Sequence, residues 1–160
     1  NKKNFFFIFN ENNLGKGGSI KKALSLANKK YAVIFDIDEY ELLDLVKIFD
    51  ILKSEDHDFL VGSRIFKEKK ANFNLKLNDA AGATKMIKVS EYKKFAFTTN
   101  KFDFEFDVLC RFAKNNKKIN EFNSNYEPRT YKEGKKLRAF KDGFTILIII
   151  LKNFFKKYEK

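Results

Sequence analysis

The chain has very few of the residues that build disulfides, thiolate metal sites and histidine-based catalytic sites. Its 160 residues contain one cysteine, one histidine, one proline and no tryptophan. The lone cysteine, Cys110, excludes an internal disulfide and a zinc site made of thiolates, and we expect it to be a buried small hydrophobe. The lone histidine, His57, lies between two aspartates, where we expect a solvated loop residue. One such histidine does not indicate a Ser-His-Asp or Cys-His catalytic site.

The sequence also has no long hydrophobic run and no signal-peptide pattern. Its most apolar segment, residues 144–155, is shorter than the roughly 20 apolar residues that a membrane-spanning helix needs. The chain begins with Asn1 instead of Met, so we expect it to be a piece of a longer protein.

The composition is that of one soluble globular domain with a strong positive charge. Hydrophobic residues make up 44% of the chain and charged residues 34%, which excludes an intrinsically disordered protein. The formal net charge of +12 and the isoelectric point near 9.6 favour an acidic partner: nucleic acid, anionic lipid or a phosphorylated substrate. The lysines are spread along the whole chain, and no RNA-recognition signature is present.

The central feature is an apolar run, residues 31–35, that ends at Asp36 and Asp38. An uninterrupted apolar run predicts a strand buried on both faces, typical of a parallel sheet. Ligands bind at the carboxyl ends of such strands, so the two carboxylates are candidates for holding Mg²⁺ or Mn²⁺. The alternative is that Asp-x-Asp is a common dipeptide pattern and that aspartate often ends a strand.

A glycine-rich turn, NLGKGGS at residues 13–19, precedes a segment with helical spacing of apolar residues. Ser19 is a suitable N-cap for that helix, and free backbone amides at a helix start bind anions. A P-loop is excluded because Lys16 is followed by Gly17 and not by serine or threonine. Glycines that serve only a tight turn remain the alternative.

The other expected elements give an α/β domain. A helix over 41–53 and a strand over 58–64 predict a right-handed crossover between neighbouring parallel strands, which puts Arg64 at the same sheet edge as Asp36. Asp107 lies in the first turn of a helix, where a carboxylate stabilises the helix dipole. The remaining predictions are a strand at 5–9 followed by a polar turn, a strand within 78–89 entered through a small-residue turn at Gly82, and a strand at 118–125. Helices are predicted at 90–95, 104–114 and 144–155.

The C-terminal segment is apolar and ends in KKYEK. A short apolar helix with lysines at its end suits the surface of an anionic membrane, and an ordinary helix docked on the sheet is the alternative. We therefore divide the chain into residues 1–140, a partial catalytic domain, and residues 141–160, an apolar and basic helix.

Several short motifs follow one another in a specific order. They are NLGKGG at 13–18, DID at 36–38, VGSR at 61–64, DAAG at 79–82, FDFEFDVL at 102–109 and GKKL at 134–137. In this order they resemble the family-two glycosyltransferases of GT-A fold, and most of all the dolichyl-phosphate and polyprenyl-phosphate sugar synthases. The resemblance implies a mostly parallel, Rossmann-like sheet flanked by helices, without the family's first strand-helix units.

The resemblance also implies roles for single residues. Asp36 and Asp38 match the family's catalytic aspartates, which bind the metal, and Arg64 matches an arginine near the phosphates. Lys136, with Gly134, matches a basic motif that holds the acceptor phosphate. The other implied substrate-binding residues are Gly15, Lys16, Gly17, Gly82 and Asp107. Thr84 and Leu109 depart from the family pattern, which tends to have a basic residue and a glutamate at these places.

The implied reaction is the transfer of a hexose from a nucleotide-diphosphate sugar of the UDP-glucose or GDP-mannose class to a polyprenyl phosphate, with Mg²⁺ or Mn²⁺ as cofactor. Its implied location is the cytoplasmic face of the plasma membrane or endoplasmic reticulum, with no nucleic-acid partner. Two alternatives remain open from the residues alone: a basic module that binds anionic membrane or nucleic acid, and a degenerate remnant without donor binding.

Overall fold

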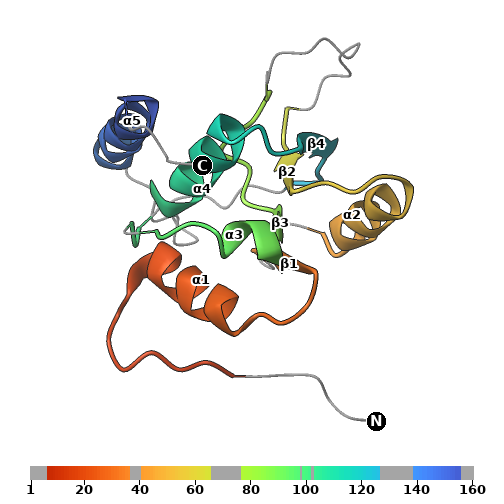
Figure 1. The fold of residues 1–160 in the computed structure, drawn as a ribbon, viewed down its shortest axis with the longest axis horizontal. Coiled ribbons are helices and arrows are strands. Elements are labelled where there is room, and N and C mark those ends of the chain that lie inside the picture. Colours follow the sequence, from red (N-terminus) through yellow and green to blue (C-terminus); the bar gives the residue numbers. More distant parts are fainter. Residues whose placement is uncertain are drawn as a thin grey trace.

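The computed structural model describes most of the chain and places five helices and four strands in the described part. It describes residues 7–36, 41–65, 77–97, 99–101, 103–126 and 139–155, with the side chains of the last range described from residue 143. The helices are α1 (Gly15–Leu26), α2 (Leu43–Ser54), α3 (Val89–Tyr92), α4 (Asp103–Lys114) and α5 (Ala139–Phe155). The strands are β1 (Tyr31–Ile34), β2 (Phe59–Ser63), β3 (Lys85–Lys88) and β4 (Ile119–Asn123), as Figure 1 shows.

The strands form one mixed sheet in the order β1-β3-β2-β4. Strand β3 is antiparallel to both of its neighbours, and β2 is parallel to β4. The predicted mostly parallel sheet is therefore wrong, and so is the prediction that β1 and β2 are neighbours. The reason lies in residues 79–84, which turn tightly against β2, with the Gly62 amide donating to the Thr84 carbonyl at 2.8 Å. After this turn the chain reverses direction, and β3 pairs with both β1 and β2.

Strands β1 and β2 nevertheless run in the same direction, because each is antiparallel to β3. Ile34 of β1 and Val61 of β2 both lie opposite Lys85 in the register. The residues that follow the two strands thus emerge at the same edge of the sheet. We call this edge, which is followed by Asp36 and Arg64, the carboxyl edge.

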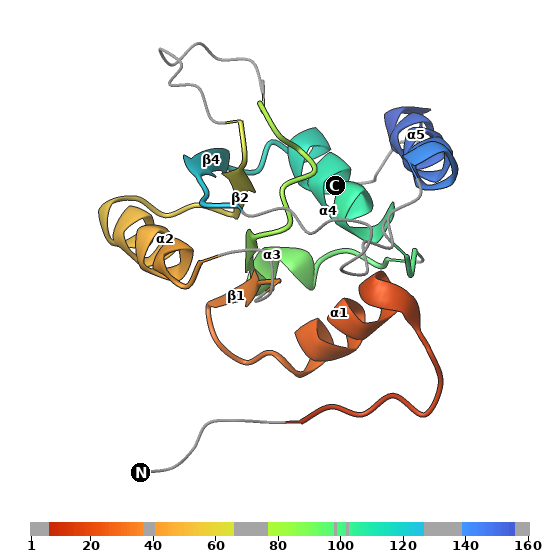
Figure 2. The ribbon, with the colours of Figure 1, turned by 180° about the vertical axis from the view of Figure 1, so that it is seen from behind.

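Helices cover both faces of the sheet, and alternate residues of β2 feed two cores. Phe59 and Val61 pack against α1, α3 and α4, whereas Leu60 packs with Ile48 of α2. This alternation follows from the two-residue period of a strand. Helix α5 lies outside these layers, against α4, in both views of the ribbon (Figures 1 and 2).

The predictions about β1, about residues 5–9 and about the start of α1 need correction. Strand β1 is half-buried at the edge of the described sheet, with Val33 40% exposed, and the fully buried strand is β2. The described part of the predicted strand at 5–9 is not a strand, and its Phe7 and Phe9 are more than 80% exposed. Helix α1 begins at Gly15, so Ser19 does not cap it and instead donates its hydroxyl to the Gly15 carbonyl at 3.1 Å.

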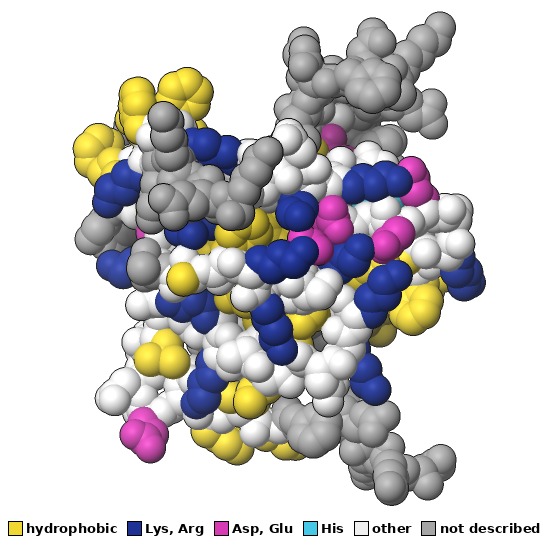
Figure 3. All heavy atoms as spheres, in the orientation of Figure 1, with side chains coloured by type: hydrophobic (Ala, Val, Ile, Leu, Met, Phe, Trp, Pro, Cys, Tyr) yellow, Lys and Arg dark blue, Asp and Glu magenta, His cyan; other side chains and the backbone are white. Residues whose placement is uncertain are grey.

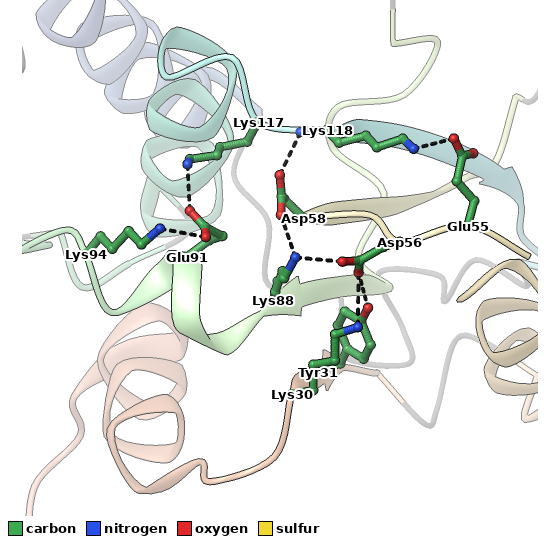
Figure 4. A network of polar contacts seen from close by, with 10 residues as sticks. All are labelled: Lys30, Tyr31, Glu55, Asp56, Asp58, Lys88, Glu91, Lys94, Lys117 and Lys118. Carbon is green, nitrogen blue, oxygen red and sulfur yellow. Dashed lines mark hydrogen bonds and ion pairs between the residues drawn. The ribbon is translucent and has the colours of Figure 1, made fainter. Parts of the chain in front are cut away.

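Alternating charges close the opposite edge of the sheet, where β1, β2 and β4 begin. Lys88 lies 2.8 Å from Asp56 and 3.3 Å from Asp58, and the Lys118 amide donates to Asp58 at 2.9 Å (Figure 4). The other members of this network are Lys30, Tyr31, Glu55, Glu91, Lys94 and Lys117. Because its charges are satisfied by one another, this edge offers little to a charged ligand.

His57 belongs to this edge and is buried, which contradicts the expectation of a solvated loop residue. Only 3% of it is exposed, and its Nε2 atom lies 3.2 Å from Glu55. Burial lowers the pKa of His57 from the usual 6.5, against the pull of Glu55, Asp56 and Asp58 and with the help of Lys118. Just below pH 6.5 the imidazole is therefore less protonated in the folded protein than in the unfolded chain.

Stability is consequently expected to fall as the pH is lowered below about 6.5. In that range the unfolded state binds more protons than the folded state, so the free energy of unfolding rises with pH, by at most about 1.4 kcal/mol per pH unit for one proton. Urea unfolding at pH 7.5, 6.5, 6.0 and 5.5 measures this slope. The His57→Gln variant is expected to lose it, because the chain has no other histidine. An equal slope in that variant would contradict the assignment.

Candidate active site

The carboxyl edge brings together two residues that the sequence singles out, Asp36 and Arg64. Asp36 follows the end of β1 by two residues, and Arg64 follows β2 directly. Since only β3 separates the two strands, their backbones lie about 10 Å apart. Asp36 and Arg64 therefore share one rim, although their strands are not neighbours.

Lys16, at the start of α1, connects Asp36 to the interior of the protein. Its Nζ atom lies 3.0 Å from Asp36 Oδ2 and 3.0 Å from Glu105 Oε1. Glu105 also pairs through Oε2 with Lys85 at 2.5 Å. Burial lowers the pKa of Lys16, but the carboxylates of Glu105 and Asp36 outweigh it and raise the pKa above its usual value. Lys16 is thus a fixed cation beside Asp36.

The glycines around Lys16 allow α1 to approach the segment before α4 closely. A Cβ atom on Gly17 would lie 2.5 Å from the Phe104 Cβ and 2.6 Å from the Lys101 carbonyl oxygen. Gly15 has a φ of +72°, which favours glycine. The Gly18 amide donates to the Asn100 carbonyl at 2.9 Å, so this amide is not available to an anion. The structural role that the sequence left open for these glycines therefore accounts for Gly15 and Gly17.

Arg64 is held by a bidentate ion pair at the rim. Its Nε and a terminal nitrogen donate to the two oxygens of Asp79 at 2.5 and 2.8 Å. Burial raises the pKa of Asp79, but the hydrogen bonds from Arg64 outweigh it, and the pKa stays below its usual value. Glu121 of β4 supports Asp79 by accepting a hydrogen bond from its amide at 2.7 Å. The Arg64 side chain is about one third exposed, so it adds positive charge to the surface beyond β2.

Gly82 belongs to the turn that leads into β3 and packs directly on β2. A Cβ atom at this position would lie 1.8 Å from the carbonyl oxygen of Gly62. The described contacts of Gly82 are thus with the protein's own backbone.

Asp107 faces away from this rim, toward α5. It is 2% exposed, and it accepts hydrogen bonds from Arg111 at 2.7 Å and from Asn153 of α5 at 3.0 Å. The acidic residue that α4 contributes to the group around Asp36 is Glu105, two positions earlier in the chain. The structure does not bring Asp107 together with Asp36.

Two of the predicted site residues, Asp38 and Lys136, lie outside the described residues, as does Gly134. Within the described ranges, no three His, Cys, Asp or Glu side chains are grouped to hold a metal ion. The Asp36 side chain is 30% exposed, and its Oδ1 atom has no partner among the residues described. A carboxylate oxygen without a described partner fits a hard cation whose other ligands come from a second carboxylate and from substrate phosphates.

A comparison with known protein families shows which family the chain belongs to. The sequence profile of the family described as "Glycosyl transferase family 2" matches residues 1–112. The chain belongs to this family. It is therefore a glycosyltransferase, an enzyme that takes a sugar from a nucleotide sugar and passes it to an acceptor. No match was found among curated proteins or among solved structures.

The described fold and site residues of this family-two glycosyltransferase can be compared with the family match. The mixed sheet with helices on both faces is consistent with a GT-A-like fold. The matched range includes Lys16, Asp36, Arg64 and Glu105 and ends in α4, before β4 and α5. None of the described helices is long and apolar enough to cross a membrane.

Sequence reasoning missed the buried charges of this glycosyltransferase. Lys85 and Glu105 are each less than 10% exposed, and neither was singled out as a site residue. A signal was present, because Lys85 interrupts the apolar strand and Glu105 stands between two phenylalanines of α4. A charged residue at a position where the pattern predicts burial indicates a buried partner.

Proposed function

We propose that this glycosyltransferase transfers a hexose from a nucleotide-diphosphate sugar to the phosphate of a polyprenol such as dolichol. The observation that supports it is the shared rim, where Asp36 and Arg64 follow two strands of one direction and the Lys16 ammonium of α1 pairs with Asp36. Such a rim suits a ligand that combines a divalent cation with a diphosphate.

On the donor side, Asp36 would hold Mg²⁺ or Mn²⁺ together with Asp38. A divalent cation bound there offsets the negative charge that develops on the departing nucleoside diphosphate. Arg64, held by Asp79, would contact the phosphates from its partly exposed side chain. Lys16 would neutralise a further phosphate charge from the other side. The donor belongs to the UDP-glucose or GDP-mannose class.

On the acceptor side, a polyprenyl phosphate is already an anion at neutral pH. Its oxygen attacks the anomeric carbon, the bond from that carbon to the diphosphate breaks, and the nucleoside diphosphate leaves with the electron pair. No general base is needed to remove a proton, which suits a chain whose only histidine is buried at the opposite edge of the sheet. Lys136, with Gly134, is the proposed contact of the acceptor phosphate.

Helix α5 supports a membrane location. Its inner side is docked on α4 through the buried Ile149 and Asn153, whereas its outer side is apolar and open to solvent. The exposed apolar residues of this helix are Phe144, Leu147, Ile150, Leu151, Phe154 and Phe155. Figure 3 shows hydrophobic side chains gathered over α5. The inner side of α5 thus suits the alternative of a docked helix, and its outer side suits the alternative of a helix on the membrane surface.

An apolar helix face on a protein of net charge +12 suits the surface of an anionic bilayer. We place the enzyme on the cytoplasmic face of such a membrane, where nucleotide sugars are made and lipid phosphates are accessible.

Donor binding tests the proposal first. UDP-glucose and GDP-mannose are titrated into the protein by calorimetry with and without Mn²⁺. We expect one donor to bind only with Mn²⁺, and Asp36→Ala to weaken this binding at least ~10-fold, since even indirect metal contacts contribute that much. Asp50→Ala removes an exposed carboxylate of α2 and is the matched control, expected to bind as the unmodified protein does.

Transfer to lipid tests the acceptor. Vesicles of anionic lipid with dolichyl phosphate are mixed with the protein and the radiolabelled donor, and label in the lipid fraction is counted. Phe154→Ser with Phe155→Ser should reduce sedimentation with vesicles and transfer, while donor binding in solution is unchanged. Absence of donor binding under every condition would indicate a degenerate remnant. Nucleic-acid binding that falls steeply with salt and ignores Asp36→Ala would indicate a basic module.

A further inference from the structure

Four charged residues from distant parts of the chain form a line from the interior to the rim. Lys85 at the start of β3 pairs with Glu105 of α4, Glu105 pairs with Lys16 of α1, and Lys16 pairs with Asp36. Lys85 is 1% exposed and Glu105 is 8% exposed, whereas Lys16 and Asp36 are partly open to solvent. The two positive and two negative charges balance.

Lys85 and Glu105, the two buried residues of this line, are fixed by their contacts. Lys85 Nζ donates to Glu105 and also to the carbonyl of Gly82, so its ammonium is fixed by the turn that packs on β2. Glu105 is thereby fixed and aims its other carboxylate oxygen at Lys16. Burying an ion pair costs desolvation energy, and apolar residues of similar size would hold α4 on the sheet as well or better. A role in orienting Lys16 therefore explains Glu105 better than a purely structural role.

Lys16 stands between an anchored carboxylate and an exposed one. An ammonium group has three N–H donors, of which one is hydrogen-bonded to Asp36, while Glu105 Oε1 lies 3.0 Å away as an ion-pair partner. A remaining N–H group can donate to a phosphate oxygen at the rim. A divalent cation that binds Asp36 weakens the pull of Asp36 on Lys16, and without Glu105 the ammonium would then swing into solvent.

We propose that Glu105, fixed by Lys85, is a positioning residue that keeps Lys16 at the rim, and that Lys16 serves as the internal counter-cation of Asp36 until a metal-bound diphosphate arrives. The inference rests on the proposed function and adds two residues to its donor site. Lys16 then donates to the diphosphate while Glu105 still holds it. In the metal-free protein the same lysine competes with a divalent cation for Asp36.

Competition for Asp36 is tested with Mn²⁺ alone, followed by the electron paramagnetic resonance signal of the free ion. Lys16→Met should bind Mn²⁺ several-fold more tightly than the unmodified protein. Lys53→Met removes the same charge from an exposed site of α2 and should leave Mn²⁺ binding unchanged. Equal or weaker Mn²⁺ binding by Lys16→Met would overturn the role of Lys16 as the counter-cation of Asp36.

The positioning role is tested in a background that remains foldable. Glu105→Gln alone leaves Lys85 buried without its charge partner, so Lys85→Met and Lys85→Met with Glu105→Gln are compared. We expect Glu105→Gln, added to Lys85→Met, to weaken the binding of Mn²⁺-UDP or Mn²⁺-GDP about 10-fold, as measured by calorimetry. When the protein also carries Lys16→Met, adding Glu105→Gln should change this affinity less than about twofold, because Glu105 would act through Lys16.

A measurement without ligand separates the inference from the proposed function. The rate at which acetic anhydride modifies Lys16, followed by mass spectrometry, should rise several-fold on Glu105→Gln in the Lys85→Met background, with exposed Lys53 unchanged. An unchanged Lys16 rate, or equal losses of affinity with and without Lys16, would overturn the positioning role. If neither Mn²⁺-UDP nor Mn²⁺-GDP binds the unmodified protein, the proposed function fails, and the role of Lys16 at a diphosphate fails with it.

Discussion

Gly82→Ala is expected to destabilise the protein by about 3 kcal/mol or more, at the upper end of what overpacking costs. The added methyl group would lie 1.8 Å from the carbonyl oxygen of Gly62, which is backbone of the fully buried strand β2 and has little room to move. Since domains are stable by only about 5–15 kcal/mol, a large part of the folded population is at risk. Urea unfolding followed by circular dichroism measures the loss.

Gly143→Ala is the matched control for this change. No atom lies within 4 Å of a Cβ added at Gly143, which is an exposed residue of α5. Alanine in a helix is favoured over glycine by about 1 kcal/mol, so this variant should be slightly more stable. If Gly82→Ala unfolded at the same urea concentration as Gly143→Ala, the close approach of the turn to β2 would be refuted.

Asp107→Leu is expected to destabilise the protein by about 3–5 kcal/mol, the usual consequence of removing one partner of a buried ion pair. Arg111 is 7% exposed and its guanidinium would lose its carboxylate partner, and Asn153 of α5 would lose the same acceptor. Thermal and urea unfolding measure the change, with the exposed Asp50→Leu as control.

A second variant distinguishes an ion-pair role of Asp107 from the substrate-binding role that the family resemblance implies. Asp107→Leu with Arg111→Met replaces both charges by apolar groups of similar size, so most of the lost stability should return. Donor affinity should then be close to that of the unmodified protein. A stable Asp107→Leu protein that fails to bind donor would instead support the substrate-binding role.

Local patterns in the sequence predicted most helices and strands because their causes are local. The apolar spacing in residues 41–53 and 104–114 is sufficient to predict α2 and α4, and the run at 58–64 is sufficient for β2. The edge shared by Asp36 and Arg64 was also predictable, since it depends on strand direction alone. The place of β3 between their strands was not, because it depends on how the turn at residues 79–84 packs on β2.

Partners that are distant in sequence account for the remaining errors. Polar residues recur every three positions along residues 41–53 and predict a solvent-facing stripe: Glu41, Asp44, Lys47, Asp50 and Lys53. Asp44 is nevertheless fully buried and accepts a hydrogen bond from Ser124. Glu105 likewise meets Lys16 and Lys85 from two other elements. A burial pattern shows that such a side chain is out of place, but only the three-dimensional arrangement shows what satisfies its charge.

Helix α4 carries Glu105 near one end and Lys114 at the other, where Lys114 binds the carbonyl groups of Asn153 and Phe154 at 2.7 and 2.9 Å. These two residues are nine positions apart, about 13 Å along a rigid helix. If α5 rests on the bilayer, α4 becomes a spacer of fixed length between the lipid surface and the donor site. Lengthening or shortening it by one turn would then change which acceptors reach the sugar without altering any group that binds the nucleotide.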